Sequence, residues 1–231
     1  MVGGGGLITI SGEVRAAFPT LRLAFLLISG VQVERSRGPE LQALIEEGIK
    51  WARDNFQLAT LKDVPIFRAY RDFFWRLGID PTKERPSAEA LVRRVLSGKP
   101  FPAVSNLVDA YNLASLRSCV PIATFDADAV VGQRIELRFA RRGEQFLGIG
   151  MARPRVLSGK ELVMADAEGP IAIYPYRDAD RTKITERTRR ALVVACGAPG
   201  VDKRRLIEAA RLAADYITRF CGGEAGEIEV V

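Results

Sequence analysis

Three polar side chains lie on a predicted helix that is apolar on two of its sides. The segment 105–126 is predicted to be helical, and it carries Asn106, Asp109 and Asn112 opposite a face of leucine, valine, tyrosine and alanine. Such a helix is normally buried, and a buried amide or carboxylate costs free energy unless it is hydrogen-bonded. These side chains therefore either form a polar network inside the fold or line a pocket. The pattern leaves both alternatives open.

The chain contains no histidine, which limits the chemistry that it can perform. Ser-His-Asp and Cys-His catalytic sets are excluded, and so are most zinc and iron sites. The three cysteines are widely spaced and are expected to be small buried hydrophobes. Two pairs of closely spaced acids are better explained as turn and cap residues than as catalytic pairs: Asp126 with Asp128, and Asp178 with Asp180. The sequence predicts no bound metal and no cofactor.

The charge balance of the chain is basic. There are 34 lysines and arginines against 28 aspartates and glutamates, which gives a net charge of +6. Glu224, Glu227 and Glu229 all lie in the last nine residues, so the remainder is more basic than the whole. This balance favours a polyanionic partner, for which tRNA or another RNA is the natural candidate. Solvated surface arginines are the alternative explanation.

Hydrophobic periodicity predicts strands first, then helices, then more strands and a final helix. The expected helices are 39–56, 65–77, 88–96 with Ser87 as N-cap, 105–126, and a last one capped by Asp202. The expected strands are 7–10, 21–33, 134–139, 145–149, 161–165, 171–174 and 191–195. This order favours an α+β fold over an alternating, doubly wound sheet.

The sequence predicts a cytoplasmic protein with no membrane partner. The longest apolar run, 23–31, is too short to cross a bilayer and is interrupted by Ser29 and Gly30. The first residues carry no evident secretory signal. The oligomeric state does not follow from the sequence.

Three segments of the chain together resemble one family. They are 83–91, 105–126 with its Asn-Leu-Val-Asp-Ala-Tyr-Asn motif, and 162–166 with 169–172. They resemble the B3/B4 tRNA-binding and editing module of the phenylalanyl-tRNA synthetase β subunit. The chain looks more closely like the freestanding form of that module, because its loop 177–185 is similar to one typical of the freestanding proteins.

The resemblance implies a fold and a domain organisation. The fold it implies is α+β, a B3/B4-like module with a β-sandwich-like core and packed helices. Residues 1–60 are expected to supply strands and a helix that pack on the module. Residues 61–221 are expected to form the B3/B4-like tRNA-binding domain, and residues 222–231 an acidic, frayed tail.

The resemblance also shows where this chain departs from the synthetase pocket. Ala123 stands where the synthetase module has a histidine, and Ala195 stands where it has the glutamate that recognises a tyrosine hydroxyl. Hydrolysis of mischarged tyrosine in the manner of the synthetase is therefore not expected. The remaining candidates for catalysis are Asn106, Asp109, Asn112, Asp180, Thr182 and Thr185. The candidates for substrate or RNA binding are Arg71, Lys83, Arg85, Arg181 and Lys183.

Each of these candidates also has a structural explanation. Arg71 and Arg85 are equally suited to ion pairs with neighbouring acids, and Thr185 to capping a turn. The function implied by the resemblance is binding of tRNA or aminoacyl-tRNA. With a catalytic pocket, the protein would be a trans-acting aminoacyl-tRNA deacylase, an ester hydrolase and not a complete synthetase. The alternatives are a non-catalytic RNA-binding adaptor and a protein that binds a small molecule such as a free amino acid.

Overall fold

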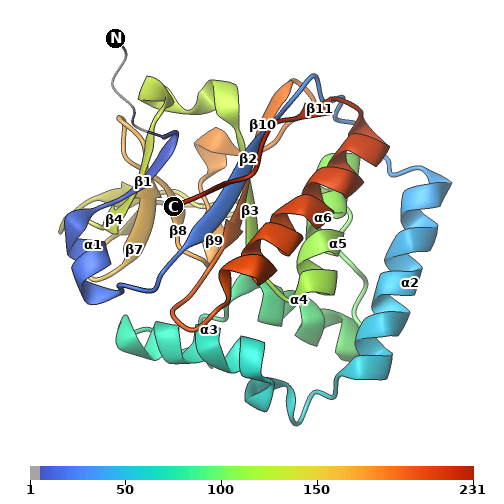
Figure 1. Ribbon diagram of the computed structural model, residues 1–231, viewed down its shortest axis with the longest axis horizontal. Coiled ribbons are helices and arrows are strands. Elements are labelled where there is room, and N and C mark those ends of the chain that lie inside the picture. The colour runs from blue at the N-terminus through green and yellow to red at the C-terminus, as the bar shows by residue number, and fades with distance from the viewer. Residues whose placement is uncertain (1–5) are drawn as a thin grey trace.

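The computed structural model describes residues 6–231 and contains two five-stranded sheets that lie side by side (Figure 1). The first sheet has the order β1 (Ile8–Ile10), β4 (Ile135–Phe139), β7 (Leu162–Ala165), β8 (Pro170–Ile173) and β9 (Arg177–Asp178). The second has the order β11 (Glu224–Ala225), β2 (Leu23–Ser29), β10 (Arg190–Cys196) and β3 (Ile122–Asp126), and β12 (Glu229–Val230) also pairs with β2. A separate hairpin consists of β5 (Gln145–Phe146) and β6 (Arg155–Val156).

The helices of residues 6–231 are α1 (Gly12–Ala17), α2 (Pro39–Asn55), α3 (Pro65–Arg76), α4 (Ser87–Leu96), α5 (Asn106–Ser118) and α6 (Lys203–Cys221). Helices α5 and α6 cover the second sheet on the side away from the first, whereas α1 packs on β4 of the first sheet (Figure 1). Helix α6 packs on β2 and β10, α5 packs on β3 and α6, and α2 packs on α5. The structure confirms the α+β fold that the order of predicted elements indicates.

The central strands of the second sheet are buried on both faces. Residues 191–196 of β10 are all buried, and β2 is almost wholly apolar. A strand with a sheet or loops on one side and helices on the other needs apolar side chains at every position, so its sequence shows no alternation. This explains why residues 23–28 and 191–196 are uninterrupted runs of apolar residues.

The segment 105–126 is not one helix, which corrects the sequence-based prediction. Ser105 caps α5 by accepting a hydrogen bond from the backbone N–H of Val108 at 3.2 Å. The helix ends at Ser118, Cys119 adopts a left-handed conformation with φ 60°, and β3 follows after Pro121. Proline cannot continue a helix because it lacks the amide proton and clashes with the preceding turn.

The start of α4 also differs from the prediction. Ser87 is the first residue of the helix rather than its N-cap, and Pro86 occupies the cap position without a side-chain hydrogen bond. The Ser87 side chain is therefore not engaged in capping.

The C-terminal segment is ordered into strands and is not frayed. Glu224–Ala225 pair with Ser29 and Ile28, and Glu229–Val230 pair with Phe25 and Ala24. The edge of β2 presents unpaired backbone groups, and the segment satisfies them despite its charged side chains. Gly223 makes the turn possible, because a Cβ at this position would lie 2.6 Å from the carbonyl oxygen of Ser29.

Residues 6–60 contribute strands to both sheets. Strand β1 pairs with β4, and β2 lies between β10 and the C-terminal strands. The expected segment 1–60 therefore supplies strands within the two sheets, although its residues 1–5 lie outside the described part of the chain. Of the helices in residues 6–231, none has the length and apolar character needed to cross a membrane.

Candidate functional site

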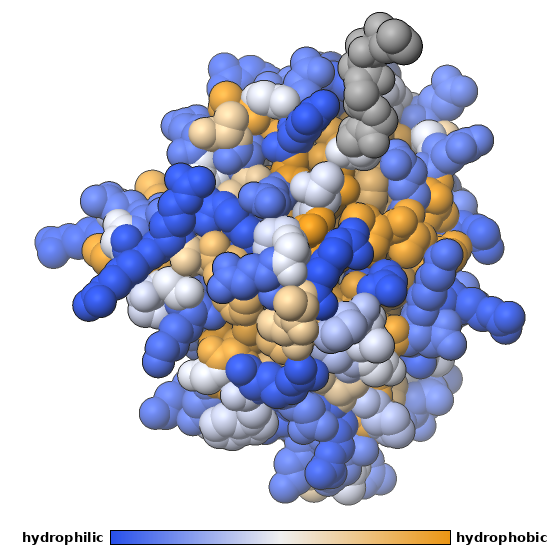
Figure 2. Space-filling view, turned by 60° about the vertical axis from the view of Figure 1, so that its left-hand side comes forward, coloured by the Kyte–Doolittle hydropathy of each residue, from blue (hydrophilic) through white to orange (hydrophobic). Residues whose placement is uncertain are grey.

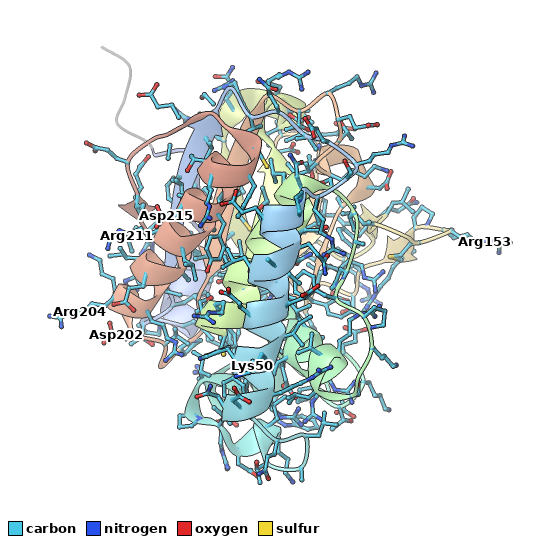
Figure 3. The ribbon with its side chains drawn as sticks, turned by 90° about the vertical axis from the view of Figure 1, so that its right-hand side faces the viewer. Lys50, Arg153, Asp202, Arg204, Arg211 and Asp215 are labelled. Carbon is cyan, nitrogen blue, oxygen red and sulfur yellow. The ribbon has the colours of Figure 1, made fainter. Side chains whose placement is uncertain are left out.

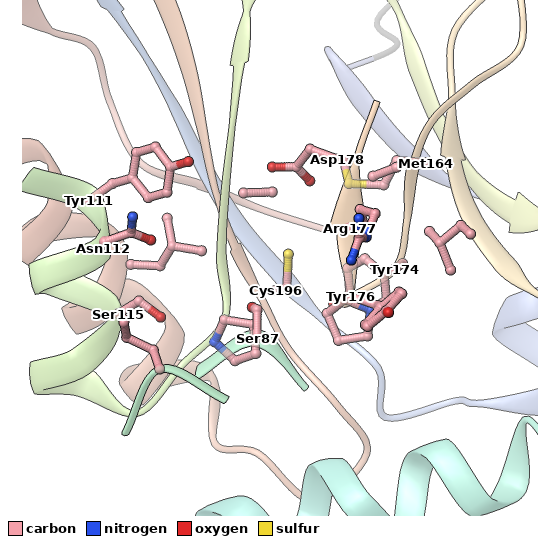
Figure 4. Close-up of a pocket in the computed structure, with 17 residues that line it drawn as sticks. Ser87, Tyr111, Asn112, Ser115, Met164, Tyr174, Tyr176, Arg177, Asp178 and Cys196 are labelled. Atoms are coloured by element: carbon pink, nitrogen blue, oxygen red, sulfur yellow. The ribbon is translucent and has the colours of Figure 1, made fainter. Parts of the chain in front are cut away.

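A cavity of about 130 Å³ lies where α5 and β3 meet the strands β8 and β9 (Figure 4). Nine of its lining residues carry a hydroxyl, amide, thiol or charged group: Ser87, Tyr111, Asn112, Ser115, Tyr174, Tyr176, Arg177, Asp178 and Cys196. The rest of the lining is mainly apolar and includes Ala123, which the resemblance aligns with a synthetase histidine. Ala195, which the resemblance aligns with a synthetase glutamate, is fully buried and lies outside the cavity.

Helix α5 divides its polar residues between the cavity and the core. Tyr111, Asn112 and Ser115 are close to one another around the helix at 100° per residue, and all three line the cavity. The Ser115 hydroxyl donates to the carbonyl oxygen of Val120 at 2.8 Å, which holds the turn that leads into β3. The amide of Asn112 makes no such contact within the described structure.

Asn106 lies in the core and has a complete set of hydrogen bonds. Its side-chain oxygen accepts from the backbone N–H groups of Glu34 and Leu107, both at 2.8 Å. Its amide nitrogen donates to the carbonyl oxygens of Gln32 at 3.0 Å and Phe220 at 3.1 Å. Asn106 therefore joins α5 to the segment after β2 and to the end of α6.

Asp109 is also buried outside the cavity. It accepts a hydrogen bond from the backbone N–H of Val104 at 3.1 Å and lies 3.5 Å from Nε of Arg37. Burial raises the pKa of its carboxyl group, while the Val104 amide and the Arg37 charge act in the opposite direction. Of the three polar residues that the sequence singles out on this helix, only Asn112 faces the cavity.

Asp178 is the acid of the cavity. It lies on β9, which is the edge of the first sheet, with Ala172 of β8 opposite it. Burial raises the pKa of its carboxyl group to about 7, and the backbone amide of Thr124 partly opposes this shift. A carboxylate with this pKa is about half ionised at neutral pH and is therefore able to accept or hold a proton there.

Two neutral groups surround the Asp178 carboxylate. The Tyr111 hydroxyl points toward it across the cavity (Figure 4), and burial followed by the Asp178 charge raises the pKa of that phenol. Burial and then the Asp178 charge likewise raise the pKa of the Cys196 thiol. Both groups are protonated at neutral pH, so Asp178 carries the titratable charge of the cavity near pH 7.

The cavity opens into a groove of about 510 Å³ that is lined by basic side chains. Five cations line it, and no acid does: Arg85, Arg93, Arg94, Lys99 and Arg177. Cavity and groove share five residues: Ser87, Leu91, Asn112, Tyr176 and Arg177. A groove with this lining attracts phosphate or carboxylate groups.

Most of the groove cations have no carboxylate partner in the part of the chain that the structure describes. Arg93 pairs with Glu89 at 2.7 Å, whereas the other four make no ion pair. The Nε atom of Arg85 is buried without a hydrogen-bond partner among residues 6–231. Arg177 lies over the ring of Tyr176 and donates to the carbonyl oxygen of Ile149 at 3.1 Å.

The remaining predicted arginines and lysines do not line the cavity or the groove. Arg71 pairs at 3.0 Å with Glu89, a fully buried acid that Arg93 also contacts. Arg181 pairs with Asp166, and Lys83 is exposed beside the loop that precedes α4. Arg71 and Arg181 thus hold elements together.

The predicted hydroxyl and acid candidates of the loop after β9 also lie elsewhere. Asp180 pairs with Lys183 at 2.7 Å. Thr185 accepts from the backbone N–H of Arg187 at 3.3 Å in a turn. Thr182 is fully buried, and its hydroxyl has no hydrogen-bond partner among residues 6–231. These positions, like Arg71 and Arg181, lie outside both the cavity and the groove.

The only feature of the sequence that points to Asp178 is its close spacing with Asp180, and hydrophobic periodicity does not show which of these two acids is functional. Asp178 and Asp180 form one of the two acid pairs assigned to turns, and Asp180 does form a local pair with Lys183. Because side chains alternate across a strand only while the strand lasts, the end of β9 at Asp178 separates the surroundings of the two acids. Among residues 6–231, no group of three or more acids, cysteines or histidines is arranged to hold a metal ion.

Comparison with known proteins identifies the family. A family model described as the B3/4 domain matches residues 69–222. The phenylalanine–tRNA ligase β subunit of Symbiobacterium thermophilum is 32% identical over 120 residues, which are 52% of this chain and 13% of that protein. The corresponding protein of Moorella thermoacetica is 31% identical over 117 residues, 51% of this chain and 14% of its own length. This chain therefore spans only a small part of either relative.

The fold agrees with that match. A crystal structure of an N-terminal fragment of the phenylalanyl-tRNA synthetase β subunit from Pyrococcus horikoshii aligns with a TM-score of 0.50. The alignment covers 94% of this chain and 49% of that one, at 12% sequence identity, and so it speaks to the fold alone. Since the family model covers about two thirds of the sequence, the chain belongs to the B3/4 domain family.

Proposed function

We propose that this protein binds the aminoacylated 3′ end of a tRNA and hydrolyses the ester that holds the amino acid. The observation that carries the proposal is that the cavity and the groove meet. A small cavity that contains Asp178 opens, through Asn112 and Arg177, into a groove whose lining has five cations and no acid. The cavity suits an amino acid and the groove suits the phosphates of the attached strand.

The proposed reaction needs no metal or cofactor. An aminoacyl ester is already activated, so a positioned water and a general base suffice. The ionised Asp178 accepts a proton from the water as the water oxygen attacks the ester carbonyl carbon. The bond from that carbon to the ribose oxygen breaks, and the ribose oxygen takes up the proton. The products are a free amino acid and a tRNA with free hydroxyls on its terminal ribose.

Asn112 is positioned to act at the ester itself. It lines both the cavity and the groove. With the amino acid in the cavity and the tRNA strand in the groove, the ester bond that joins them has to lie at this boundary. Its side-chain amide carries N–H donors, and a donor directed at the carbonyl oxygen stabilises the negative charge that develops there. We assign Asn112 this role and assign Arg85, Arg94, Lys99 and Arg177 to the phosphates.

A second candidate function is binding without hydrolysis. Ala123 occupies the position of the synthetase histidine, so the cavity lacks that side chain. An RNA-binding adaptor would keep the groove and would not need the ionised form of Asp178. A binder of free amino acids would use the cavity and would not need the groove.

Release of amino acid from mischarged tRNAs tests the proposal. The protein is incubated with tRNAs that each carry a different amino acid, and the free amino acid is measured against spontaneous hydrolysis. Asp178→Asn is expected to lower the rate by about 100-fold or more. Asp180→Asn is the matched control, because Asp180 lies two residues away and pairs with Lys183 outside the cavity.

The other outcomes identify the alternatives. Binding of tRNA with no release of any amino acid would indicate the adaptor. Stabilisation by a free amino acid with no affinity for RNA would indicate the small-molecule binder. Equal rates for the Asp178→Asn and Asp180→Asn variants would remove Asp178 from the mechanism. Thermal unfolding of both variants shows whether the fold is kept.

A further inference from the structure

The cavity has a mouth and a floor that differ in composition. The mouth consists of the residues that it shares with the groove, and all of these except the buried Leu91 are partly exposed, as for Asn112 and Arg177. The floor consists of the least exposed lining residues. Met164 has no exposed surface, Tyr174 is 1% exposed, Cys196 and Ile173 are 2% exposed, and Ala172 is 3% exposed. A group that enters from the groove therefore meets mainly apolar side chains at its far end.

The volume of the cavity limits what can enter. It is about 130 Å³. An apolar protein cavity of about 150 Å³ accommodates a single benzene molecule. A phenyl or phenol ring that is attached to the rest of an amino acid therefore exceeds the space available. Side chains of a few heavy atoms fit.

The electrostatics of the cavity limit the charge of what can enter. A side-chain carboxylate would be placed near Asp178 in a poorly hydrated space, where like charges repel strongly. The side chains of lysine and arginine are excluded by their length, because they are longer than the space allows.

We infer that the cavity selects aminoacyl esters whose amino acid has a small, uncharged side chain, and that Met164 sets the upper size limit. This inference rests on the proposed use of the cavity as the aminoacyl site. Met164 has the longest aliphatic side chain of the floor, and it is held in β7 between Leu137 of β4 and Ala172 of β8. Because the strand is fixed on both sides, removing the end of this side chain enlarges the cavity instead of collapsing it.

Binding of non-hydrolysable analogues tests the inference without relying on catalysis. The probes are 3′-aminoacylamino-3′-deoxyadenosines, in which an amide replaces the ester, carrying alanyl, valyl, tyrosyl, aspartyl or lysyl groups. Their affinities for the full-length protein are measured by titration calorimetry. The alanyl and valyl probes are expected to bind at least about tenfold more tightly than the other three.

Two variants move the size limit in opposite directions. Met164→Ala is expected to improve binding of the tyrosyl probe by about tenfold and to leave the alanyl probe within about threefold. Ala123→Val narrows the cavity from β3 with a residue that suits a strand, and it is expected to weaken the valyl probe more than the alanyl probe. Met151→Ala is the matched control, because Met151 is a partly buried methionine outside the cavity.

The possible results separate this inference from the proposed function. Equal affinity for alanyl and tyrosyl probes overturns the inference, even if the protein hydrolyses mischarged tRNA. If the protein prefers the small probes and Met164→Ala weakens this preference, the inference is supported. This holds even if no tRNA is deacylated, and in that case only the catalytic part of the proposed function fails. Absence of binding for every probe overturns the inference, whereas the release assay with mischarged tRNA decides on the proposed function. A loss of discrimination in Met151→Ala equal to that in Met164→Ala overturns the role of Met164.

Discussion

Asp178 combines a position in the cavity with a carboxyl group that titrates near neutrality. Its pKa of about 7 arises mainly from burial. The titratable groups that face it, Tyr111 on α5 and Cys196 on β10, have raised pKa values and stay neutral. A carboxylate with a pKa near the working pH is suited to general base catalysis. A large fraction of it is ionised at that pH, and it is still basic enough to take a proton from water.

The rate of deacylation is therefore expected to depend on the ionisation of Asp178. It should rise about tenfold per pH unit below pH 7 and level off above it, since only the ionised carboxylate accepts the proton from water. The measurement is the rate of amino acid release between pH 5 and pH 8.5, with spontaneous hydrolysis subtracted at each pH. A flat profile over this range would contradict the assignment of Asp178 as the base.

The same carboxyl group is expected to lower the stability of the folded protein at higher pH. Its pKa rises from 3.8 to about 7 on folding, so the native state binds a proton that the unfolded chain has released. The associated stability is complete below about pH 4 and is lost as the pH rises through 7. Asp178→Asn removes this dependence, and at pH 8 the variant should be more stable than the original protein by about 1–3 kcal/mol.

Urea unfolding at pH 5 and pH 8 measures this effect. The advantage of Asp178→Asn should be larger at pH 8 than at pH 5, and Asp180→Asn should show no such change. An advantage that is equal at both pH values would contradict the raised pKa. A stabilising substitution that abolishes activity would be consistent with a strained, poorly solvated site maintained for function.

Helix α5 shows how one element serves both the core and the site. Asn106 and Asn112 are about 120° apart around the helix at 100° per residue, so the two amides face different surroundings. Asn106 makes four hydrogen bonds in the core, and Asn112 faces the cavity. The sequence leaves two alternatives open for polar residues on this helix, a polar network in the core and the lining of a pocket. Asn106 takes the first role and Asn112 the second.

Matched substitutions of these two asparagines should have opposite effects. Asn106→Ala leaves buried backbone groups unpaired and is expected to cost about 2–4 kcal/mol of stability. Asn112→Ala is expected to cost less than about 1 kcal/mol and to reduce deacylation strongly. Urea unfolding and the release assay measure the two effects. A loss of stability in Asn112→Ala as large as that in Asn106→Ala would indicate that Asn112 is part of the scaffold.

The C-terminal strands are a second element with a measurable role. Removing residues 224–231 exposes the edge of β2 and removes the partly buried side chains of Ile228 and Val230 from the core surface that they cover. The free energy of unfolding is expected to fall by about 2 kcal/mol. A variant with glutamine at positions 224, 227 and 229 keeps the strands and removes the charges, and it should retain its stability. Equal destabilisation of the two variants in thermal unfolding would assign the effect to charge.

The helices were the most predictable elements because their periodicity is long. The predicted helices 39–56 and 65–77 agree with α2 and α3 to within one residue at each end. Strand β3 was hidden within the predicted helix 105–126, because five residues cannot establish a period and both of its faces are buried. The C-terminal strands form only because β2 offers an open edge, and a single sequence does not reveal this tertiary pairing. The cavity likewise depends on residues far apart in the sequence, such as Tyr111 and Asp178.

At the scale of the whole molecule, charge is distributed unevenly. Hydrophilic side chains cover much of the face in Figure 2, with apolar patches between them. Basic residues also project from other faces, such as Arg153 and, on the opposite side of the view in Figure 3, Arg204 and Arg211. What distinguishes the groove is the absence of acids among its lining residues. Net charge alone would attract RNA everywhere, whereas in the proposed function the groove directs the bound strand to the cavity.

The salt dependence of RNA binding should report on the groove cations that have no carboxylate partner. Four of its cations are in this state in the described structure, so four phosphate contacts predict a logarithmic slope of about −3 for a single strand. Affinity for a tRNA should then fall about 50-fold between about 50 mM and about 200 mM salt.

Arg94→Glu should reduce both the affinity and the slope. Arg204→Glu makes the same charge change on the exposed start of α6, outside the groove, and is the control (Figure 3). Fluorescence anisotropy at several salt concentrations measures both. Equal losses in the two variants would show that the strand is held by the general charge of the protein, and the groove would then have no special part in bringing an aminoacyl ester to Asp178.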